Sequence, residues 1–440
     1  MWGRGKLGGG AVSNRKDAVF YKCMWRVIPL IMLLYLINRI DRINVGFAAL
    51  TMNKDLGFSP SVFGFAAGVF FISYAPSQVP ASLILERMGA RRFIFLITLA
   101  WGTISALTAF VETPLGYYAI RFLLGLAEAG FFPGVIFYLT LWFPQAYRAR
   151  LIAAFFIASP LAPVVAGPLS SELLRLDGVA GLHGWQWLFL VEAMPAGILA
   201  LATILFLPDS PQRAPFLSDA EKQSVLARLG KENAGRERPV LSALLDLRVI
   251  VCGLIYFGFE IGNAGIVFWL PQIVQGMGFS PFATGYLVIL PSLAALVAML
   301  IWSRSSDAKG ERIYHLVIAF ALGIGGFLIA ALSSSNVLVF AGLTLAWMGL
   351  QSSFPLLFSL PSAFLSGRAA AGGIALVSSI GITGGFAGPY IMGRLKEETG
   401  GYSAGMIVMA LGSVMALVLV LALSRAMARE AAAKTAKASA

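Results

Sequence analysis

The chain has 440 residues, of which 58% are hydrophobic and only 12% are charged. Because about 25% of the residues in an ordinary soluble domain are charged, this composition excludes a soluble protein. It also excludes an outer-membrane β-barrel, whose strands are short and alternate in hydropathy, since the apolar runs here are continuous and about 20 residues long. The sequence therefore predicts a polytopic α-helical membrane protein.

The apolar runs recur along the whole chain. They fall at about 25–50, 61–84, 91–112, 115–142, 148–172, 186–207, 247–274, 282–302, 313–332, 336–360, 369–392 and 403–427. Each run is long enough to cross a bilayer as a helix. We therefore expect an all-α polytopic membrane protein with twelve transmembrane helices in two pseudo-symmetric six-helix bundles.

A polar, charged stretch that begins with Pro208-Asp-Ser-Pro211 separates the two sets of spans. The expected organisation is a cytoplasmic N-terminal tail at 1–24, an N-terminal six-helix bundle at 25–207, a cytoplasmic linker at 208–246, a C-terminal six-helix bundle at 247–427 and a cytoplasmic C-terminal tail at 428–440.

The net charge of +12 would suggest a nucleic-acid partner in a soluble protein. Here the basic residues are distributed asymmetrically about the bilayer. When both termini are placed in the cytoplasm, the external connections hold only Lys54, Arg175, Arg394 and Lys396. This distribution satisfies the positive-inside rule, so we expect two cytoplasmic termini and no nucleic-acid partner.

An internal repeat supports the division into halves. An offset of 221 residues relates Gly57-Phe-Ser-Pro60 to Gly278-Phe-Ser-Pro281, Glu86-Arg-Met-Gly-Ala-Arg91 to Asp307-Ala-Lys-Gly-Glu-Arg312, and Gly167-Pro168 to Gly388-Pro389. Parallel repeats of this kind are typical of carriers that bind their substrate near the bilayer midplane, between the halves.

Charged residues inside the apolar spans mark the candidate site. The first span holds Arg39, Asp41 and Arg42, and the fourth holds Arg121 and Glu128, which share one helix face because they are seven residues apart. Intramembrane charges are costly and usually line a transport pathway. The alternative, a buried ion pair that only ties helices together, stays open.

Six strings stand out in the chain: Asp41-Arg-Ile-Asn44, Glu86-Arg-Met-Gly-Ala-Arg-Arg92, Arg121-Phe-Leu-Leu-Gly-Leu-Ala-Glu128, Gly184-Trp-Gln-Trp187, Phe268-Trp-Leu-Pro271 and Gly384-Gly-Phe-Ala-Gly-Pro389. They resemble the major facilitator superfamily and, within it, the anion:cation symporter family of phthalate, tartrate and sugar-acid permeases. The resemblance covers nearly the whole chain. The sequence departs from the family pattern at Arg39, Phe358, Ser378 and Ile382, which leaves the substrate open.

The resemblance implies proton-coupled uptake of an organic carboxylate across a bacterial inner (plasma) membrane, with an aromatic carboxylate, a tartrate-like acid or a sugar acid as the substrate. Carried over by position, Asp41 and Glu128 would bind protons, while Arg42 and Arg121 would bind the substrate anion. A guanidinium suits this task because it forms two parallel hydrogen bonds to a carboxylate and remains charged.

Further polar residues of the spans are candidates for the substrate pocket, although each could equally make a helix–helix hydrogen bond. They are Tyr35, Tyr74, Gln78, Ser159, Tyr256, Asn263, Ser352 and Ser378. Gating is predicted for Glu86, Arg87, Arg91, Asp307 and Arg312 in the repeated loops, and for Arg39 and Glu260. The repeat offset aligns Arg39 with Glu260, so the two could pair across the halves or find partners within their own half.

Two other transport modes remain possible, namely a proton-driven exporter and an anion exchanger of the same fold. A membrane enzyme is disfavoured, because the sequence has no nucleophile and base in a catalytic pattern. We expect a monomer that binds a small organic anion and protons in a lipid bilayer, with no cofactor and no metal site.

Overall fold

The computed structural model describes residues 11–233, 246–361, 364 and 367–439, and almost all of them are helical. The helices are α1 (Ala11–Asp55), α2 (Pro60–Met88), α3 (Ala90–Leu107), α4 (Pro114–Glu128), α5 (Phe131–Trp142), α6 (Gln145–Phe156), α7 (Ala158–Leu174), α8 (Gly184–Phe206), α9 (Asp219–Asn233), α11 (Leu247–Gly276), α12 (Pro281–Leu287), α13 (Ile289–Lys309), α14 (Ile313–Leu332), α15 (Asn336–Leu357), α16 (Gly367–Ile382), α17 (Gly384–Thr399) and α18 (Ser403–Ser439). Within these ranges, twelve helical spans are long and apolar enough to cross a membrane, which confirms the predicted fold class.

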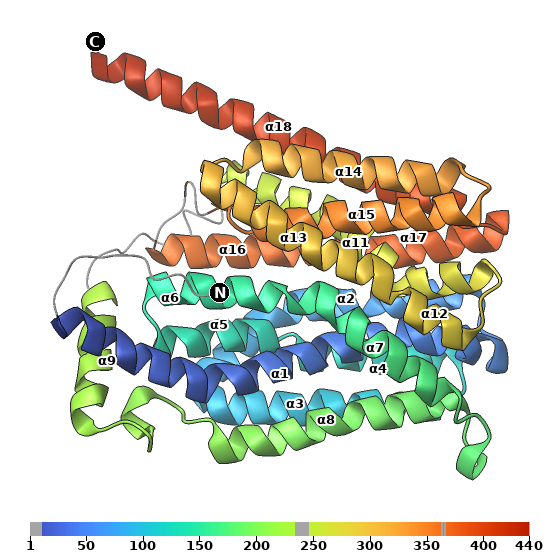
Figure 1. Ribbon diagram of the computed structural model, residues 1–440, viewed down its shortest axis with the longest axis horizontal. Helices are drawn as coiled ribbons and strands as arrows, with labels where there is room; N and C mark the ends of the chain where they lie inside the picture. The colour runs from blue at the N-terminus through green and yellow to red at the C-terminus, as the bar shows by residue number, and fades with distance from the viewer. Residues whose placement is uncertain (1–10, 234–245, 362–363, 365–366, 440) are drawn as a thin grey trace.

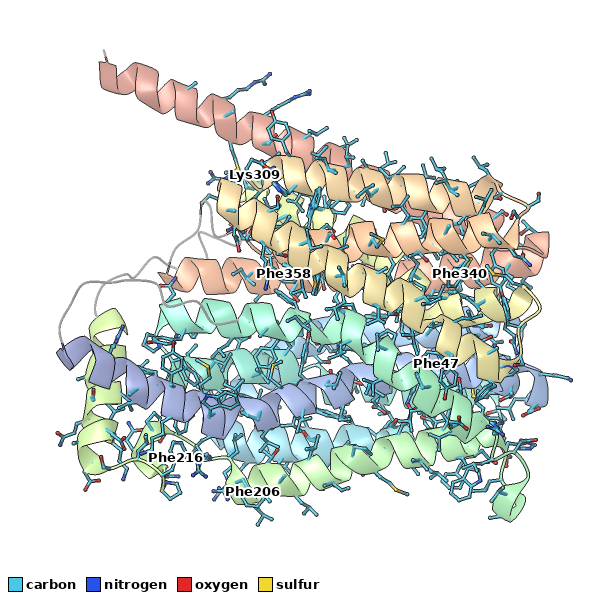
Figure 2. The ribbon with its side chains drawn as sticks, viewed as in Figure 1. Phe47, Phe206, Phe216, Lys309, Phe340 and Phe358 are labelled. Carbon is cyan, nitrogen blue, oxygen red and sulfur yellow. The ribbon has the colours of Figure 1, made fainter. Side chains whose placement is uncertain are left out.

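The spans form two bundles that lie side by side (Figure 1). Helices α1 to α8 make the first bundle and α11 to α18 make the second. Large apolar side chains cover the outside, as expected for a surface in contact with lipid. Figure 2 shows Phe206, which is 75% exposed, at the outer edge of the first bundle, whereas Phe358 lies between the bundles.

Three of the predicted spans are interrupted helices. A proline cannot donate a backbone hydrogen bond to the carbonyl four residues earlier. Pro133, Pro160 and Pro291 each follow such a break, between α4 and α5, between α6 and α7, and between α12 and α13. The apolar runs of the sequence predict three continuous helices here, so that expectation is wrong at these breaks.

The bundles touch closely on the side of the molecule opposite the start of α1 and the end of α18, which we name the far side (Figure 1). Helix α2 crosses α17 where a Cβ atom on Gly64 would lie 2.5 Å from the carbonyl oxygen of Pro389. Helix α7 crosses α12 where a Cβ on Gly167 would lie 2.3 Å from the carbonyl oxygen of Gly285. Only glycine allows these backbones to approach so closely.

The two crossings are related by the sequence repeat, because the offset of 221 residues converts Gly64 to Gly285 and Gly167 to Gly388. Polar contacts accompany them. Ser59 at the start of α2 donates a hydrogen bond to Glu397 of α17 over 2.9 Å, and Tyr286 of α12 donates one to Glu172 of α7 over 3.2 Å. The far side is therefore closed by a pair of matching contacts.

The polar segment between the bundles contains α9, which packs on the N-terminal part of α1. Lys22 of α1 forms an ion pair with Glu221 of α9 at 2.9 Å. Helix α1 already begins at Ala11, and residues 1–10 and 234–245 lie outside the described residues. The expected boundaries of the tails and of the linker stay predictions.

Candidate functional site

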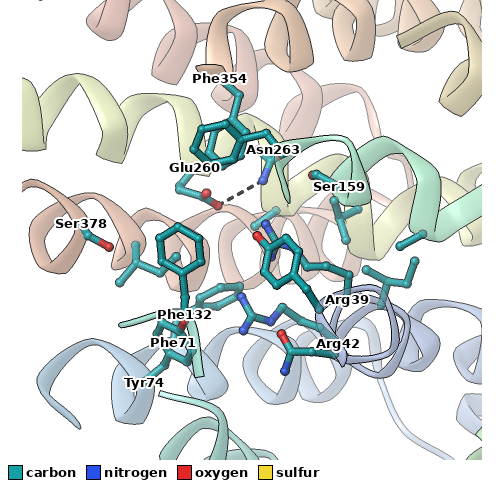
Figure 3. Close-up of a pocket in the computed structure, with 18 of the residues that line it drawn as sticks. Arg39, Arg42, Phe71, Tyr74, Phe132, Ser159, Glu260, Asn263, Phe354 and Ser378 are labelled. Atoms are coloured by element: carbon teal, nitrogen blue, oxygen red, sulfur yellow. Dashed lines mark hydrogen bonds between the residues drawn. The ribbon is translucent and has the colours of Figure 1, made fainter. Parts of the chain in front are cut away.

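A cavity of about 70 Å³ lies between the bundles (Figure 3). It is lined by Tyr35, Asn38, Arg39, Arg42 and Ile43 of α1, Phe71 and Tyr74 of α2, Phe132 of α5, Phe156 of α6, Ser159, Ala162 and Pro163 of α7, Tyr256, Glu260, Asn263, Ala264, Val267 and Phe268 of α11, Phe354 of α15, Phe358, and Ser378 and Ile382 of α16. The cavity is thus built by both halves of the chain.

Arginines form the wall of the cavity on the side of α1. Arg42 is 6% exposed, and its guanidinium lies 4.8 Å from the ring centres of both Phe70 and Tyr74. Arg39 stacks on Tyr35 at 5.4 Å. Stacking on aromatic faces stabilises a partly desolvated guanidinium and leaves its N–H groups available in the ring plane.

Arg42 is also tied to Glu128 at the end of α4. Its Nη2 atom lies 2.7 Å from Oε2 of Glu128, and its Nε atom donates to the same oxygen over 3.2 Å. Glu128 is fully buried, and within the described part of the chain its other oxygen, Oε1, has no hydrogen-bond donor. The ion pair therefore joins a residue of the cavity wall to a carboxylate in the interior of the first bundle.

The opposite wall carries a chain of uncharged donors and one acid. Asn263 donates to Glu260 over 3.2 Å, as the dashed line in Figure 3 marks. Gln351 of α15 donates to Asn263 and also to Ser159 of α7, both over 3.3 Å. Because Ser159 belongs to the first bundle, this chain of hydrogen bonds crosses the interface between the bundles.

Aromatic rings bound the cavity toward the side where α1 begins. The ring centres of Phe156 in the first bundle and Phe354 in the second are 4.8 Å apart, and Tyr256 and Phe358 pack against the same group of rings. Nearby, Ser378 lies 3.5 Å from Gln78 across the same interface. The cavity is thus narrowed on this side and closed on the far side.

Most of the predicted pocket residues line this cavity, but some do not. Those in the wall are Arg42, Tyr35, Tyr74, Ser159, Tyr256, Asn263 and Ser378. Gln78 and Ser352 are buried outside the wall. Arg121 lies behind it, with its guanidinium against the rings of Phe70 and Phe268 and its Nε donating to the carbonyl of Ala66 over 3.4 Å.

The predicted proton-binding residues lie behind the wall as well. Asp41 is 1% exposed, points into the first bundle and accepts hydrogen bonds from Ser105 of α3 and from Asn44. Together with Glu128 it forms a buried acidic layer next to Arg42 and Arg121. Neither carboxyl lines the cavity in this structure.

Several of the predicted gating residues have partners within their own half. Arg91 donates to the carbonyl of Ile204 in α8, and Arg312 pairs with Asp307 at 3.3 Å. Glu86 and Arg87 lie at the end of α2. Arg39 and Glu260 both line the cavity, yet no ion pair joins them among the contacts of the described residues. The cross-bundle pair stays a prediction for another conformation.

Sequence reasoning missed three polar residues of this region. Asn38 and Gln351 were passed over because a single amide in an apolar span resembles an ordinary helix contact. Glu192 of α8 is 2% exposed and lies next to the acidic layer. Its signal was present in the sequence, because an acid within an apolar span is by itself a candidate for function.

Comparison with known proteins identifies the family. A family model for the Major Facilitator Superfamily matches residues 31–389 and 252–439. A putative tartrate transporter of Agrobacterium vitis is 45% identical, with 91% of this chain and 90% of the relative covered. A quinolone resistance transporter of Acinetobacter baumannii is 40% identical over 88% of this chain and 90% of the relative.

A further relative, the putative metabolite transport protein NicT of Pseudomonas putida, is 40% identical over 91% of this chain and 93% of its own length. Among solved structures, a bacterial homologue of the human lysosomal transporter Spinster matches with a TM-score of 0.72 at 16% identity, covering 90% of this chain and 96% of that one. The chain belongs to the major facilitator superfamily, and it is a multi-pass membrane transporter and not an enzyme.

Proposed function

We propose that this protein carries a small organic carboxylate together with protons by alternating access. The observation that carries the proposal is the ion pair between Arg42, a residue of the cavity wall, and the buried Glu128, at 2.7 Å. An arginine at the wall is the group that a substrate carboxylate would bind.

The same ion pair supplies the coupling. While Glu128 is ionised, it occupies the Nη2 and Nε atoms of Arg42 that a substrate would use. Protonation of Glu128 weakens its ion pair with Arg42, so that the guanidinium becomes free to bind a carboxylate in the cavity. Substrate and proton therefore favour one another, since each removes the same competing interaction.

The opposite wall favours a hydroxylated acid. Glu260 and Asn263 offer a carboxyl acceptor and an amide to uncharged hydrogen-bonding groups, and Gln351 supports Asn263 from behind the wall. A carboxylate on Arg42 and a hydroxyl group on the opposite wall would use both sides of a cavity of about 70 Å³. A tartrate-like acid has this pattern, and close relatives are named tartrate transporters. We place the protein in a bacterial inner membrane with both termini in the cytoplasm.

Uptake into liposomes tests the proposal. Protein reconstituted in vesicles with an alkaline interior should accumulate labelled tartrate from an acidic medium, and collapse of the pH gradient should abolish accumulation. Glu128→Gln should still exchange tartrate across the bilayer but should no longer concentrate it. Glu398→Gln, which alters an exposed ion pair with Arg394, is the matched control and should behave as wild type. Concentration of tartrate by Glu128→Gln at the wild-type level would refute the coupling scheme.

A second candidate, proton-driven drug export, is favoured by one relative that is named a quinolone resistance transporter. The aromatic rings of Phe156, Phe354 and Phe358 would suit a flat apolar substrate. The same vesicles, prepared with an acidic interior, would concentrate a quinolone if the protein were an exporter. An anion exchanger would instead carry out tartrate exchange at an unchanged rate without any pH gradient and would show no net accumulation.

A further inference from the structure

Arg39 is a cavity residue that the scheme above does not use. It lies on α1 three residues before Arg42, and both side chains reach the same cavity (Figure 3). Its guanidinium stacks on Tyr35 at 5.4 Å. In the described part of the chain no carboxylate pairs with it, and its buried Nε atom has no hydrogen-bond partner. Arg39 is thus a charged group of the wall with an unoccupied donor.

The two arginines differ in what balances their charge. Arg42 is paired with the buried Glu128 at 2.7 Å. Glu260 is the acid of the opposite wall, and it accepts a hydrogen bond from Asn263 and makes no ion pair with Arg39 in the described structure. Protonation of Glu128 therefore leaves two guanidiniums on the α1 wall, neither of them held by a carboxylate.

The spacing of the two arginines suits a molecule with two carboxylates. Residues three apart in a helix share one face and are separated by about 4.5 Å along its axis. Each guanidinium can form two parallel hydrogen bonds to one carboxylate. A short chain with a carboxylate at each end can therefore lie along α1, with one end on Arg39 and the other on Arg42. Hydroxyl groups between the ends would then face Glu260 and Asn263.

We propose that Arg39 is the second carboxylate-binding residue of the cavity and makes the protein select dicarboxylates over monocarboxylates. A monocarboxylate on Arg42 would leave Arg39 without a bound anion when the cavity closes. Removing a guanidinium from water without a partner costs free energy. A dicarboxylate avoids this cost, because each of its carboxylates meets one arginine. The inference rests on the proposed function, since it assigns a second task within the same substrate site.

Binding to the purified full-length protein in lipid nanodiscs, measured by calorimetry at mildly acidic pH, tests the proposal. The probes are tartrate and its monoamide, which has the same shape but only one carboxylate. Wild type should bind tartrate about 10-fold more tightly, as expected for one charge-assisted pair. Succinate and its monoamide, which lack hydroxyl groups, should show the same preference for the diacid.

Arg39→Gln should bring the ratio of the two affinities close to one. Tartrate should bind more weakly to this variant, whereas the monoamide should bind no worse than to wild type, because the unpaired charge is gone. Retained binding of the monoamide also shows that the variant is folded. Arg39→Lys keeps the charge and should retain a preference for tartrate.

Two further variants separate this role from others. The electrostatic field of Arg39 reaches Glu260, so a pairing of these side chains is the competing role for Arg39. In that case Glu260→Gln would lose the preference for tartrate as Arg39→Gln does, whereas a carboxylate-binding Arg39 requires the preference to remain. Arg394→Gln, which removes a positive charge from an exposed pair with Glu398, is the control and should change neither affinity.

Three outcomes overturn the inference. They are equal affinities of wild type for tartrate and its monoamide, an unchanged ratio in Arg39→Gln, and loss of the preference in Glu260→Gln. All three leave the proposed carboxylate transport intact, because the ligands would still bind to wild type at Arg42. If wild type bound none of the four compounds, the proposed function would fail together with the inference, so the two failures are distinguishable.

Discussion

Arg42 of α1 donates from both Nη2 and Nε to a single oxygen of Glu128, over 2.7 and 3.2 Å. Arg42 lines the cavity, whereas Glu128 is fully enclosed by the first bundle. The pair is therefore a direct link between the cavity and a buried acid of the first bundle. Its geometry depends on the forked shape of the guanidinium.

Arg42→Lys should reduce transport although the positive charge is kept. A lysine cannot reproduce the two donors that reach one oxygen, and a hydrogen bond to a charged group contributes about 1.5–3 kcal/mol. We expect kcat/KM for uptake to fall by a factor of about 10 or more. Arg394→Lys, which changes an exposed pair with Glu398, should stay close to wild type. If Arg42→Lys transported as well as Arg394→Lys, the two-donor geometry of the Arg42 guanidinium would have no role in transport.

Larger residues at Gly64 and Gly167, where helices of the two bundles cross, should separate the bundles on the far side. In Gly64→Ala and Gly167→Ala the added Cβ would lie 2.5 and 2.3 Å from backbone carbonyl oxygens of the other bundle. The distance between spin labels at Leu56 and Phe279, measured by pulsed electron paramagnetic resonance, should therefore increase. Gly197→Ala is the control, because no atom lies within 4 Å of the added Cβ. Unchanged distances in the first two variants would show that the crossings do not hold the closed state.

Gln351 should couple the bundles energetically. Gln351→Leu removes its bonds to Ser159 and Asn263, each worth about 0.5–1.5 kcal/mol. The melting temperature of the purified protein should fall in Gln351→Leu and in Ser159→Ala, and the double variant should lose less than the sum. Thr344→Ala, which alters a bond within α15, should add fully to Gln351→Leu. Full additivity in the first pair would refute the contact.

Lowering the pH should weaken the packing of α9 on α1, because it protonates Glu221 and removes the ion pair with Lys22. The ion pair with Lys22 and the backbone N–H of Ser218 hold the pKa of Glu221 below its usual range. A carboxyl with a lowered pKa stabilises the folded form above the unfolded pKa of about 4.3, and this contribution is lost as the pH falls through the folded value. Hydrogen exchange of α9, corrected for the intrinsic effect of pH, should therefore accelerate in acid.

Glu221→Gln should produce the same acceleration at neutral pH. The effect should correspond to at most about 1 kcal/mol, because the pair is near the surface. Asp219→Asn is the control, since Asp219 is 94% exposed and pairs with Lys222 within α9 itself. If exchange in α9 did not respond to Glu221→Gln, the ion pair would not be what holds α9 in place.

The sequence was sufficient for the arrangement of the spans, because apolar length and the repeat offset are both linear properties of a chain. It was less informative about which side chains meet. Arg121 was expected in the pathway because it shares a helix face with Glu128, yet its guanidinium lies between Phe70 and Phe268, which come from two other helices. Such contacts depend on how helices rotate against each other, and no local pattern records that rotation.

The contacts of Glu192 could not be predicted from the sequence, for a different reason. Its position within an apolar span was visible, but its neighbours Asn44 and Ser170 are distant in the chain and adjacent in space. The repeat also aligned Arg39 with Glu260, and both residues line one cavity. Whether they pair depends on a conformation other than this one.

The prolines that divide α4 from α5, α6 from α7, and α12 from α13 have a mechanical consequence. At each of them the ladder of backbone hydrogen bonds is already interrupted. A bend at such a point breaks fewer backbone hydrogen bonds than a bend in an uninterrupted helix would. A conformational change can then be concentrated at these breaks, so that the helical segments on either side remain intact.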